Sequence, residues 1–321
     1  MLIFANIMSR RRFMQTSYDF GHELLDSVYD LLQSQHHDRG MDKLMFGLLR
    51  LRNQFHKTEW EDFYLNSCRR HPLNEIVQQS PFTSRAFQKP RGYAGDAIMM
   101  DYIYHRKHAG NGLTEDGRKV YDWEYSTPGC ASVRERRDIA AQYVDRVCAE
   151  KKNARILSVA CGHLREARQS AALAEGRVGE FWALDQDINS LEVVESEEYA
   201  HQVKTARESV KSILKGKVNF TGFDLIYSLG LYDYLSRPIA QRLTTMLFRM
   251  LAPGGKLLLV NFAPNLQNIG YMEAYMDWHL IYRDEVEIEQ LAEKIPPEQT
   301  SNIRTFRDSY KNFVFLELAR R

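Results

Sequence analysis

The stretch that most constrains the fold is Arg155–Glu166, with the sequence RILSVACGHLRE. Its first half is apolar and rich in β-branched residues, which is typical of a buried strand. Its second half turns through small residues into a predicted helix, and a second apolar run, FWALD, ends at Asp185. A strand, a small-residue turn and an acid that closes the next strand predict a nucleotide-binding βαβ unit, in which the acid accepts hydrogen bonds from ribose hydroxyls.

The glycine content of this turn narrows the class of nucleotide. A dinucleotide fold uses G-x-G-x-x-G to bring a pyrophosphate against a helix. This turn has glycine only at Gly162, with Ala160 and Leu164 at the neighbouring positions. The pattern therefore disfavours NAD and FAD. For this stretch taken alone, an ordinary buried βαβ turn that binds nothing is the alternative.

The turn resembles motif I of the class I methyltransferases that depend on S-adenosylmethionine (SAM), whose usual pattern is D/E-x-G-x-G-x-G. Ser158 stands where that pattern has an acid, and two glycines are missing. Further along the chain, LAPGGKLLL at 251–259 is typical of the same family, as is a predicted C-terminal antiparallel hairpin. The resemblance implies an α/β fold, with a Rossmann-like seven-stranded class I methyltransferase core, an α-helical N-terminal cap and SAM as cofactor.

The resemblance also implies which residues bind SAM. Arg134, on the helix before motif I, is the candidate for the SAM carboxylate, because a guanidinium fork matches a carboxylate. Its alternative is membership of a solvated charge run with Arg136 and Arg137. The other candidates follow the motif I strand or the next three predicted strands: Ala160, Cys161, Gly162, Asp185, Gln186, Ser209, Val210, Ser228 and Leu229.

Three residues are candidates for catalysis. Tyr232 follows the fourth predicted strand, and ligands in open α/β sheets bind outside the carboxyl ends of the strands. His279 lies in an aromatic-rich segment after the fifth strand, and Tyr93 lies in the loop KPRGYAGD at 89–96. Each has a structural alternative: Tyr232 as a packing residue, His279 as a satisfied structural histidine, and the loop of Tyr93 as a turn with an arginine–acid pair.

The loop KPRGYAGD, together with GHLRE and ALDQD, resembles the bacterial methyltransferases associated with 3-hydroxy fatty acid methyl ester signals. That resemblance implies O-methylation of a small-molecule carboxylate and a role in signal biosynthesis. A carboxylate with a pKa of about 4 is ionised at neutral pH and needs no general base. Two alternatives stay open, namely N- or O-methylation of a small heteroaromatic or amino-acid-like metabolite, and a protein that binds SAM without catalysis.

The chain is predicted to form two domains, a helical cap and substrate domain at 1–125 and a SAM-binding domain at 126–321. Apolar residues at helical spacing between Ser17 and Leu51 predict two helices that separate at Gly40. The aromatic-rich segment after the fifth strand is expected to form a second lid. Its tyrosines and Trp278 at helical spacing fit a packed core equally well.

Composition excludes several classes of function. The 321 residues carry a net charge of +1, so no global field recruits nucleic acid, and no (N/D)PPY motif follows the fourth strand. No apolar run approaches the roughly 20 residues of a membrane span, so we expect no stable membrane association. Four cysteines without a CxxC pair predict neither disulfides nor a metal site, and fit a cytoplasmic protein. A homodimer is left open.

Overall fold

The structure is a computed structural model that describes residues 2–106, 110 and 112–321, with side chains described from Gln15 onward. The chain forms two compact units. Unit 1 comprises Met1–Cys130 and Leu266–His279, and unit 2 comprises Ala131–Asn265 and Leu280–Arg321. The first boundary thus falls five residues after the predicted one at 125/126. Unit 1 also includes Leu266–His279, which the sequence assigns to the SAM-binding domain.

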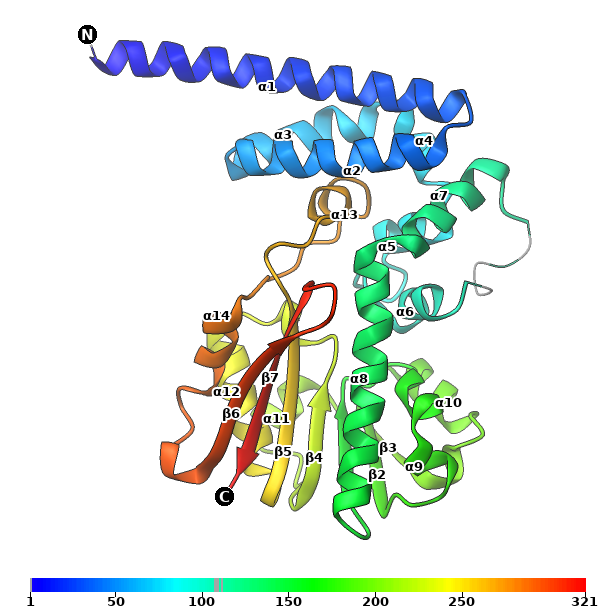
Figure 1. Ribbon diagram of the computed structural model, residues 1–321, viewed down its shortest axis with the longest axis vertical. Helices are drawn as coiled ribbons and strands as arrows, with labels where there is room; N and C mark the ends of the chain where they lie inside the picture. Colours follow the sequence, from blue (N-terminus) through cyan, green and yellow to red (C-terminus); the bar gives the residue numbers. More distant parts are fainter. Residues whose placement is uncertain (1, 107–109, 111) are drawn as a thin grey trace. The chain divides into compact units, whose positions relative to one another are not determined.

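Within the described residues, unit 2 is built on a seven-stranded sheet in the order β3-β2-β1-β4-β5-β7-β6 (Figure 1). Neighbouring strands are parallel from β3 to β5, and β7 runs antiparallel to both β5 and β6. This arrangement confirms the predicted Rossmann-like core with its C-terminal antiparallel hairpin. The strands are β1 (Arg155–Val159), β2 (Glu180–Asp185), β3 (Val203–Arg207), β4 (Phe223–Ser228), β5 (Leu251–Phe262), β6 (Thr300–Arg307) and β7 (Phe313–Arg320).

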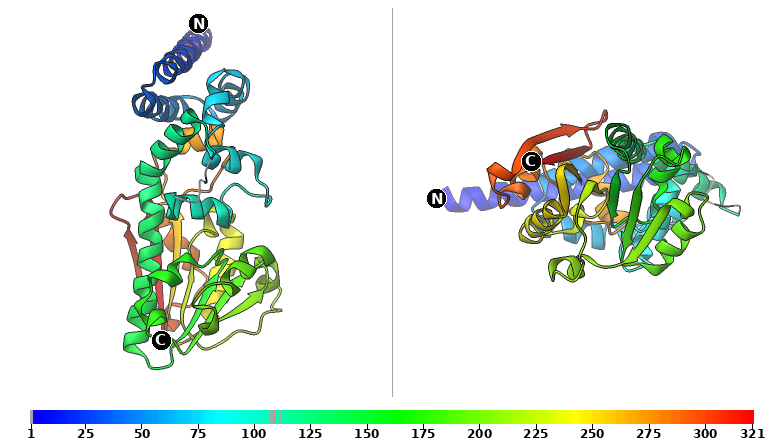
Figure 2. Two further views of the ribbon diagram at one scale, coloured as in Figure 1. Left: turned by 90° about the vertical axis from the view of Figure 1, so that its right-hand side faces the viewer. Right: turned by 90° about the horizontal axis from the view of Figure 1, so that it is seen from below.

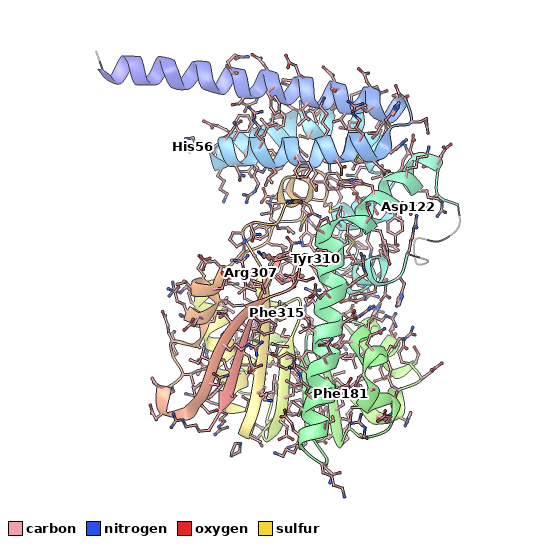
Figure 3. All side chains as sticks on the ribbon, viewed as in Figure 1. His56, Asp122, Phe181, Arg307, Tyr310 and Phe315 are labelled. Atoms are coloured by element: carbon pink, nitrogen blue, oxygen red, sulfur yellow. The ribbon has the colours of Figure 1, made fainter. Side chains whose placement is uncertain are left out.

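Alternate residues of the strands face opposite sides of the sheet. On one side Leu157 and Val159 belong to the main apolar core, together with residues of α11 (Val210–Leu214), α12 (Arg237–Arg249) and α14 (Glu285–Glu289). The helices α8 (Pro128–Glu150) and α10 (Ile188–Glu195) cover the other side (Figure 2). On that side Phe181 and Phe315 are fully buried (Figure 3). The core therefore has two layers, one on each side of the sheet, while the edge strands β3 and β6 are exposed or half-buried along most of their length.

The chain after β1 differs from the single helix predicted over Arg165–Ala174. A 3-10 turn, η3 (Arg165–Gln169), is followed by the short α9 (Ala171–Ala174). Ser170 separates them because its hydroxyl caps α9 by accepting from the Leu173 N–H at 3.2 Å. The carboxylate of Asp145 on α8 accepts the N–H groups of Ala171 and Ala172. These two caps fix the start of α9, and the extended backbone of Ser170, with φ −82° and ψ 119°, interrupts the helix there.

Unit 1 is helical. Its first two helices are separated by Ser34–His36, not at Gly40, which lies inside α2. The prediction was wrong because Gly40 serves close packing: a Cβ there would be 2.3 Å from Leu32 Cδ1. The helices of unit 1 are α1 (Leu2–Gln33), α2 (His37–Gln54), α3 (Lys57–Asn66), α4 (Leu73–Val77), α5 (Pro81–Gln88), α6 (Ala97–Tyr104), α7 (Glu115–Ser126) and α13 (Ile269–Tyr275), and the 3-10 turn η1 (Cys68–Arg70) follows α3.

The returning helix α13 forms the centre of unit 1. All of its residues are buried, which fits the core alternative for the aromatic stripe. The Glu273 carboxylate accepts from Trp60 Nε1 at 2.7 Å and from Arg52 Nε at 2.9 Å, and the Tyr275 carbonyl accepts from Gln78 at 2.8 Å. Among the residues that the structure describes, no helix combines the length and apolar character needed to cross a bilayer.

Candidate functional site

The backbone turns sharply through left-handed conformations at the carboxyl end of β1. Ala160, Gly162 and Leu164 have φ angles of 54°, 54° and 49°. Glycine adopts this region freely, whereas each of the other two residues costs about 1–2 kcal/mol. Cys161 N–H donates to the Leu184 carbonyl at 3.1 Å, which fixes the turn against the end of β2. Backbone strain of this kind clusters at ligand-binding sites.

Asp185 joins this turn to the end of β2. Its Oδ2 accepts from Gly162 N–H at 2.8 Å and its Oδ1 accepts from Asp187 N–H at 2.9 Å. The side chain is 7% exposed, and burial raises the pKa of the carboxyl above its usual value while the two amide bonds oppose that rise. An ionised carboxylate offers about four lone-pair sites. The carboxylate therefore keeps acceptor capacity for a ligand such as a ribose diol.

The end of β3 adds the next predicted residues. The Asp185 carbonyl accepts from Glu208 N–H at 3.0 Å, which draws this segment to the end of β2. Ser209 caps α11 by accepting from Ser212 N–H at 3.1 Å, and Val210 begins that helix. Gln186, next to Asp185, is exposed. The structure thus brings these candidates to one edge of the sheet, and their contact with adenine stays a prediction.

The end of β4 closes the same edge. The Ser228 hydroxyl donates to the Val159 carbonyl at 2.9 Å and is fully buried, so it ties β4 to β1. The Leu229 carbonyl accepts from Arg136 Nη1 at 2.6 Å. Ser228 and Leu229 therefore lie beside the motif I turn as predicted from the sheet topology, with polar atoms that already hold the strand ends together.

The arginines of α8 are not a solvated charge run. Arg136 is 3% exposed and lies 4.8 Å over the ring of Phe313, and Arg137 is 9% exposed. Arg134, the predicted ligand of the SAM carboxylate, is half-buried. Sequence reasoning passed over Arg136, although helical spacing from Val133 to Ala140 places it on the buried stripe of α8.

Tyr232 follows β4 as predicted, but its side chain belongs to the main apolar core. It is fully buried on the 3-10 turn η5 (Tyr232–Tyr234), and its hydroxyl lies 3.1 Å from Thr244 Oγ1 on α12. Burial raises the pKa of the phenol well above its usual range. The hydroxyl faces the apolar core, so the structure supports the packing alternative, and we do not retain Tyr232 as a catalytic residue.

The other two catalytic candidates belong to unit 1. His279 is about half exposed, with Nε2 3.4 Å from Asp277 Oδ1. Asp277 also pairs with Lys89, at the start of the KPRGYAGD loop, and with Arg69 at 2.9 Å. Tyr93 lies half-buried in that loop. These ion pairs order the segment, and the catalytic roles of His279 and Tyr93 stay predictions.

The acid at the other end of the loop has two structural roles. Asp96 caps α6 by accepting from Met99 N–H at 2.8 Å, and it binds Arg85 through both carboxylate oxygens, at 2.9 and 2.6 Å. The arginine–acid pair of the structural alternative therefore exists, but its arginine comes from α5 and not from the loop.

One buried acid at the site was missed from the sequence. Glu166, in η3, is 4% exposed, and its Oε1 accepts from Tyr227 OH at 2.8 Å and lies 3.5 Å from Ser158 Oγ. Burial raises the pKa of its carboxyl. The signal was available, because Glu166 ends the GHLRE motif, but nothing in a linear pattern distinguishes a buried acid from a helix-start acid.

Comparison with known proteins finds likeness in structure alone. No protein-family model and no curated protein matches the sequence. A possible exported protein from Bordetella parapertussis matches with a TM-score of 0.61 and 16% identity, over 88% of this chain and 95% of that one. Magnesium protoporphyrin IX methyltransferase from Synechocystis PCC 6803 with bound SAM matches at 0.43 and 14%, over 70% and 96%. N-methyltransferase NodS from Bradyrhizobium japonicum WM9, in complex with S-adenosyl-L-homocysteine, matches at 0.41 and 13%, over 58% and 87%.

These structural matches show the fold of the chain and not what it binds. At TM-scores of 0.43 and 0.41, the two methyltransferases say nothing about what this chain binds. At 16% identity, the match over nearly the whole length of both chains shows the fold alone. The chain therefore shares its overall fold with the Bordetella protein, and its sheet has the strand order of a Rossmann-like methyltransferase core.

Proposed function

We propose that this protein is a SAM-dependent methyltransferase that acts on a small molecule. The observation that carries the proposal is the contact between Asp185 and Gly162 at the left-handed turn after β1. It combines a carboxylate that retains free acceptors with a backbone that a ligand can approach closely. The residues present fit the adenosyl end of SAM, and the loose turn suits a nucleoside without a pyrophosphate.

Five of the candidate residues have a defined task in this proposal. Bound SAM supplies a methyl group that the positive charge of its sulfonium already activates. Asp185 holds the ribose, and Ser209 and Val210 border the adenine. Arg134 binds the carboxylate of the amino-acid end, and Leu229 lies at the strand edge nearest the acceptor. The protein therefore contributes mainly alignment and the exclusion of water.

We further propose that the methyl acceptor is a carboxylate, such as that of a 3-hydroxy fatty acid. The support is the resemblance carried by KPRGYAGD, GHLRE and ALDQD. An ionised carboxylate needs no general base, which agrees with the Tyr232 hydroxyl facing Thr244 in the core. If the acceptor is instead a hydroxyl or an amine, His279 and Tyr93 are the candidates for accepting its proton.

The test follows product formation by mass spectrometry. The full-length protein is incubated with SAM and, in separate reactions, with 3-hydroxy fatty acids of several chain lengths and with heteroaromatic amines. The proposal predicts a methyl ester and an equal amount of S-adenosylhomocysteine (SAH). A methylated amine as product would contradict the carboxylate acceptor and would support methyltransferase activity. Binding of SAM without SAH release from any acceptor or lysate fraction would contradict catalysis and favour a SAM-binding regulatory protein.

A further inference from the structure

A buried carboxylate stands where the motif I resemblance lacks its acid. Ser158 occupies the acidic position of D/E-x-G-x-G-x-G. Its hydroxyl lies 3.5 Å from Oε1 of Glu166, which reaches the end of β1 from η3, eight residues later in the chain. The Tyr227 hydroxyl on the neighbouring strand β4 donates to the same oxygen at 2.8 Å. Glu166 thus places a carboxyl group at the point where Ser158 supplies none.

The surroundings of this carboxylate favour a positively charged ligand. Glu166 is 4% exposed, and the hydrogen-bond donors that reach its side chain from Ser158 and Tyr227 are neutral hydroxyls. The guanidinium of Arg136 favours its ionised form but does not cancel the effect of burial, which raises the pKa of the carboxyl. An ionised carboxylate in such a place is stabilised by a cation that donates a hydrogen bond.

We infer that Glu166 binds the ammonium group at the amino-acid end of SAM and is the functional replacement for the missing motif I acid. This inference rests on the proposed function. Two acids then lie near the end of β1: Asp185 contacts the turn at Gly162, and Glu166 contacts the strand before the turn at Ser158. Asp185 recognises the ribose, and Glu166 makes the site selective for ligands that carry the amine.

The test compares two ligands that differ only in that amine. The first is SAH, and the second is its deaminated analogue, which keeps the thioether and the carboxylate. Calorimetry with the full-length protein measures both affinities for the wild type and for Glu166→Gln. We expect Glu166→Gln to weaken SAH about 10- to 100-fold, the worth of a hydrogen bond to a charged group, and to leave the affinity for the analogue nearly unchanged.

A matched control separates ammonium binding from support of the turn. Glu197 is 7% exposed and pairs with Arg165 and Arg168 on either side of Glu166. Glu197→Gln loosens the same segment without touching the end of β1, so it should change the affinities for SAH and its analogue by equal factors. If Glu166→Gln does not fold, Tyr227→Phe removes only the hydroxyl that orients Glu166, and it should still weaken SAH more than the analogue.

The contrary outcomes are distinct. Equal losses for the two ligands in Glu166→Gln, or in Tyr227→Phe if the first variant does not fold, would overturn this inference and leave the proposed function in place. No loss for either ligand would do the same. A folded wild type that binds neither SAH nor the analogue would overturn the proposed function and this inference with it.

Discussion

At the scale of single residues, the account depends first on Asp185. Replacing it with alanine removes the acceptor for two ribose hydroxyls and one of the supports of the Gly162 N–H. We expect Asp185→Ala to weaken SAH about 100-fold or more, because each hydrogen bond to a charged group contributes about 1.5–3 kcal/mol. Calorimetry measures the loss. The control is Asp187→Asn, which retains the cap of α10 and should bind SAH with the affinity of the wild type. An unchanged affinity for SAH in Asp185→Ala would refute the ribose assignment.

The sequence predicted the place of residues that end a strand. It did not predict which charged residues are buried. Asp185 ends an apolar run, and the run alone placed it at the sheet edge beside Gly162. Arg136 was part of a charge run that could be solvated, and Glu166 had no assigned role, yet both are buried. For Tyr232, the predicted position after β4 was correct, but the predicted catalytic role was wrong because its hydroxyl faces Thr244 in the core.

At the scale of elements, a buried carboxyl joins three helices of unit 1. Glu124 on α7 is 2% exposed and accepts from Ser80 at the start of α5, from Thr83 on α5 and from Tyr271 on α13, the last at 3.0 Å. Burial raises the pKa of Glu124 to about 7, against the opposing effect of the three hydroxyls. The junction is therefore most stable with this carboxyl protonated.

This junction predicts a pH dependence with a definite sign. Below about pH 4.5 the carboxyl is protonated in the folded and the unfolded chain; between there and about pH 7 only the unfolded chain releases the proton. The free energy of unfolding should thus fall as pH rises from about 4.5 to about 7 and level off above pH 7. Glu124→Gln should reduce this pH-dependent loss in the free energy of unfolding, by about 3 kcal/mol at most. Urea unfolding of both proteins from pH 4 to pH 8 measures it, and parallel pH profiles for the two would contradict the assignment.

The packing of α13 against α2 depends on a glycine. A Cβ on Gly270 would lie 2.7 Å from the backbone carbon of Leu48, and a backbone cannot rotate away as a side chain can. We expect Gly270→Ala to destabilise unit 1 by about 1–3 kcal/mol, measured as a lower urea midpoint. The control is Ala274→Gly on α13, which removes packing without a clash. Gly92→Ala is unsuitable as a control because the φ angle of Gly92 is positive. Wild-type stability in Gly270→Ala would refute the close contact.

Element boundaries were harder to predict than element order. The strand sequence β1 to β7 follows from apolar runs and turns, and the sheet topology confirms it. The motif I helix was overextended because Ser170 and Asp145 cap a second short helix inside it. The sequence predicts a helix break at Gly40 because close packing against Leu32 leaves no trace in a linear pattern.

At the scale of the whole molecule, the chain passes between its two units more than once. Unit 1 is completed by Leu266–His279, which leaves the sheet after β5 and returns before α14. A sequence cannot reveal such a return, because α13 has the aromatic composition of a lid and of a core alike. The excursion explains why His279 and Tyr93, which come from distant parts of the chain, both belong to unit 1.

The most direct test of the account is a crystal structure of the full-length protein soaked with SAH. The account predicts SAH at the turn from Ala160 to Gly162, with both ribose hydroxyls within hydrogen-bonding distance of the Asp185 carboxylate. A well-ordered turn without the ligand in SAH-saturated crystals, or SAH bound at another place on the protein, would contradict it.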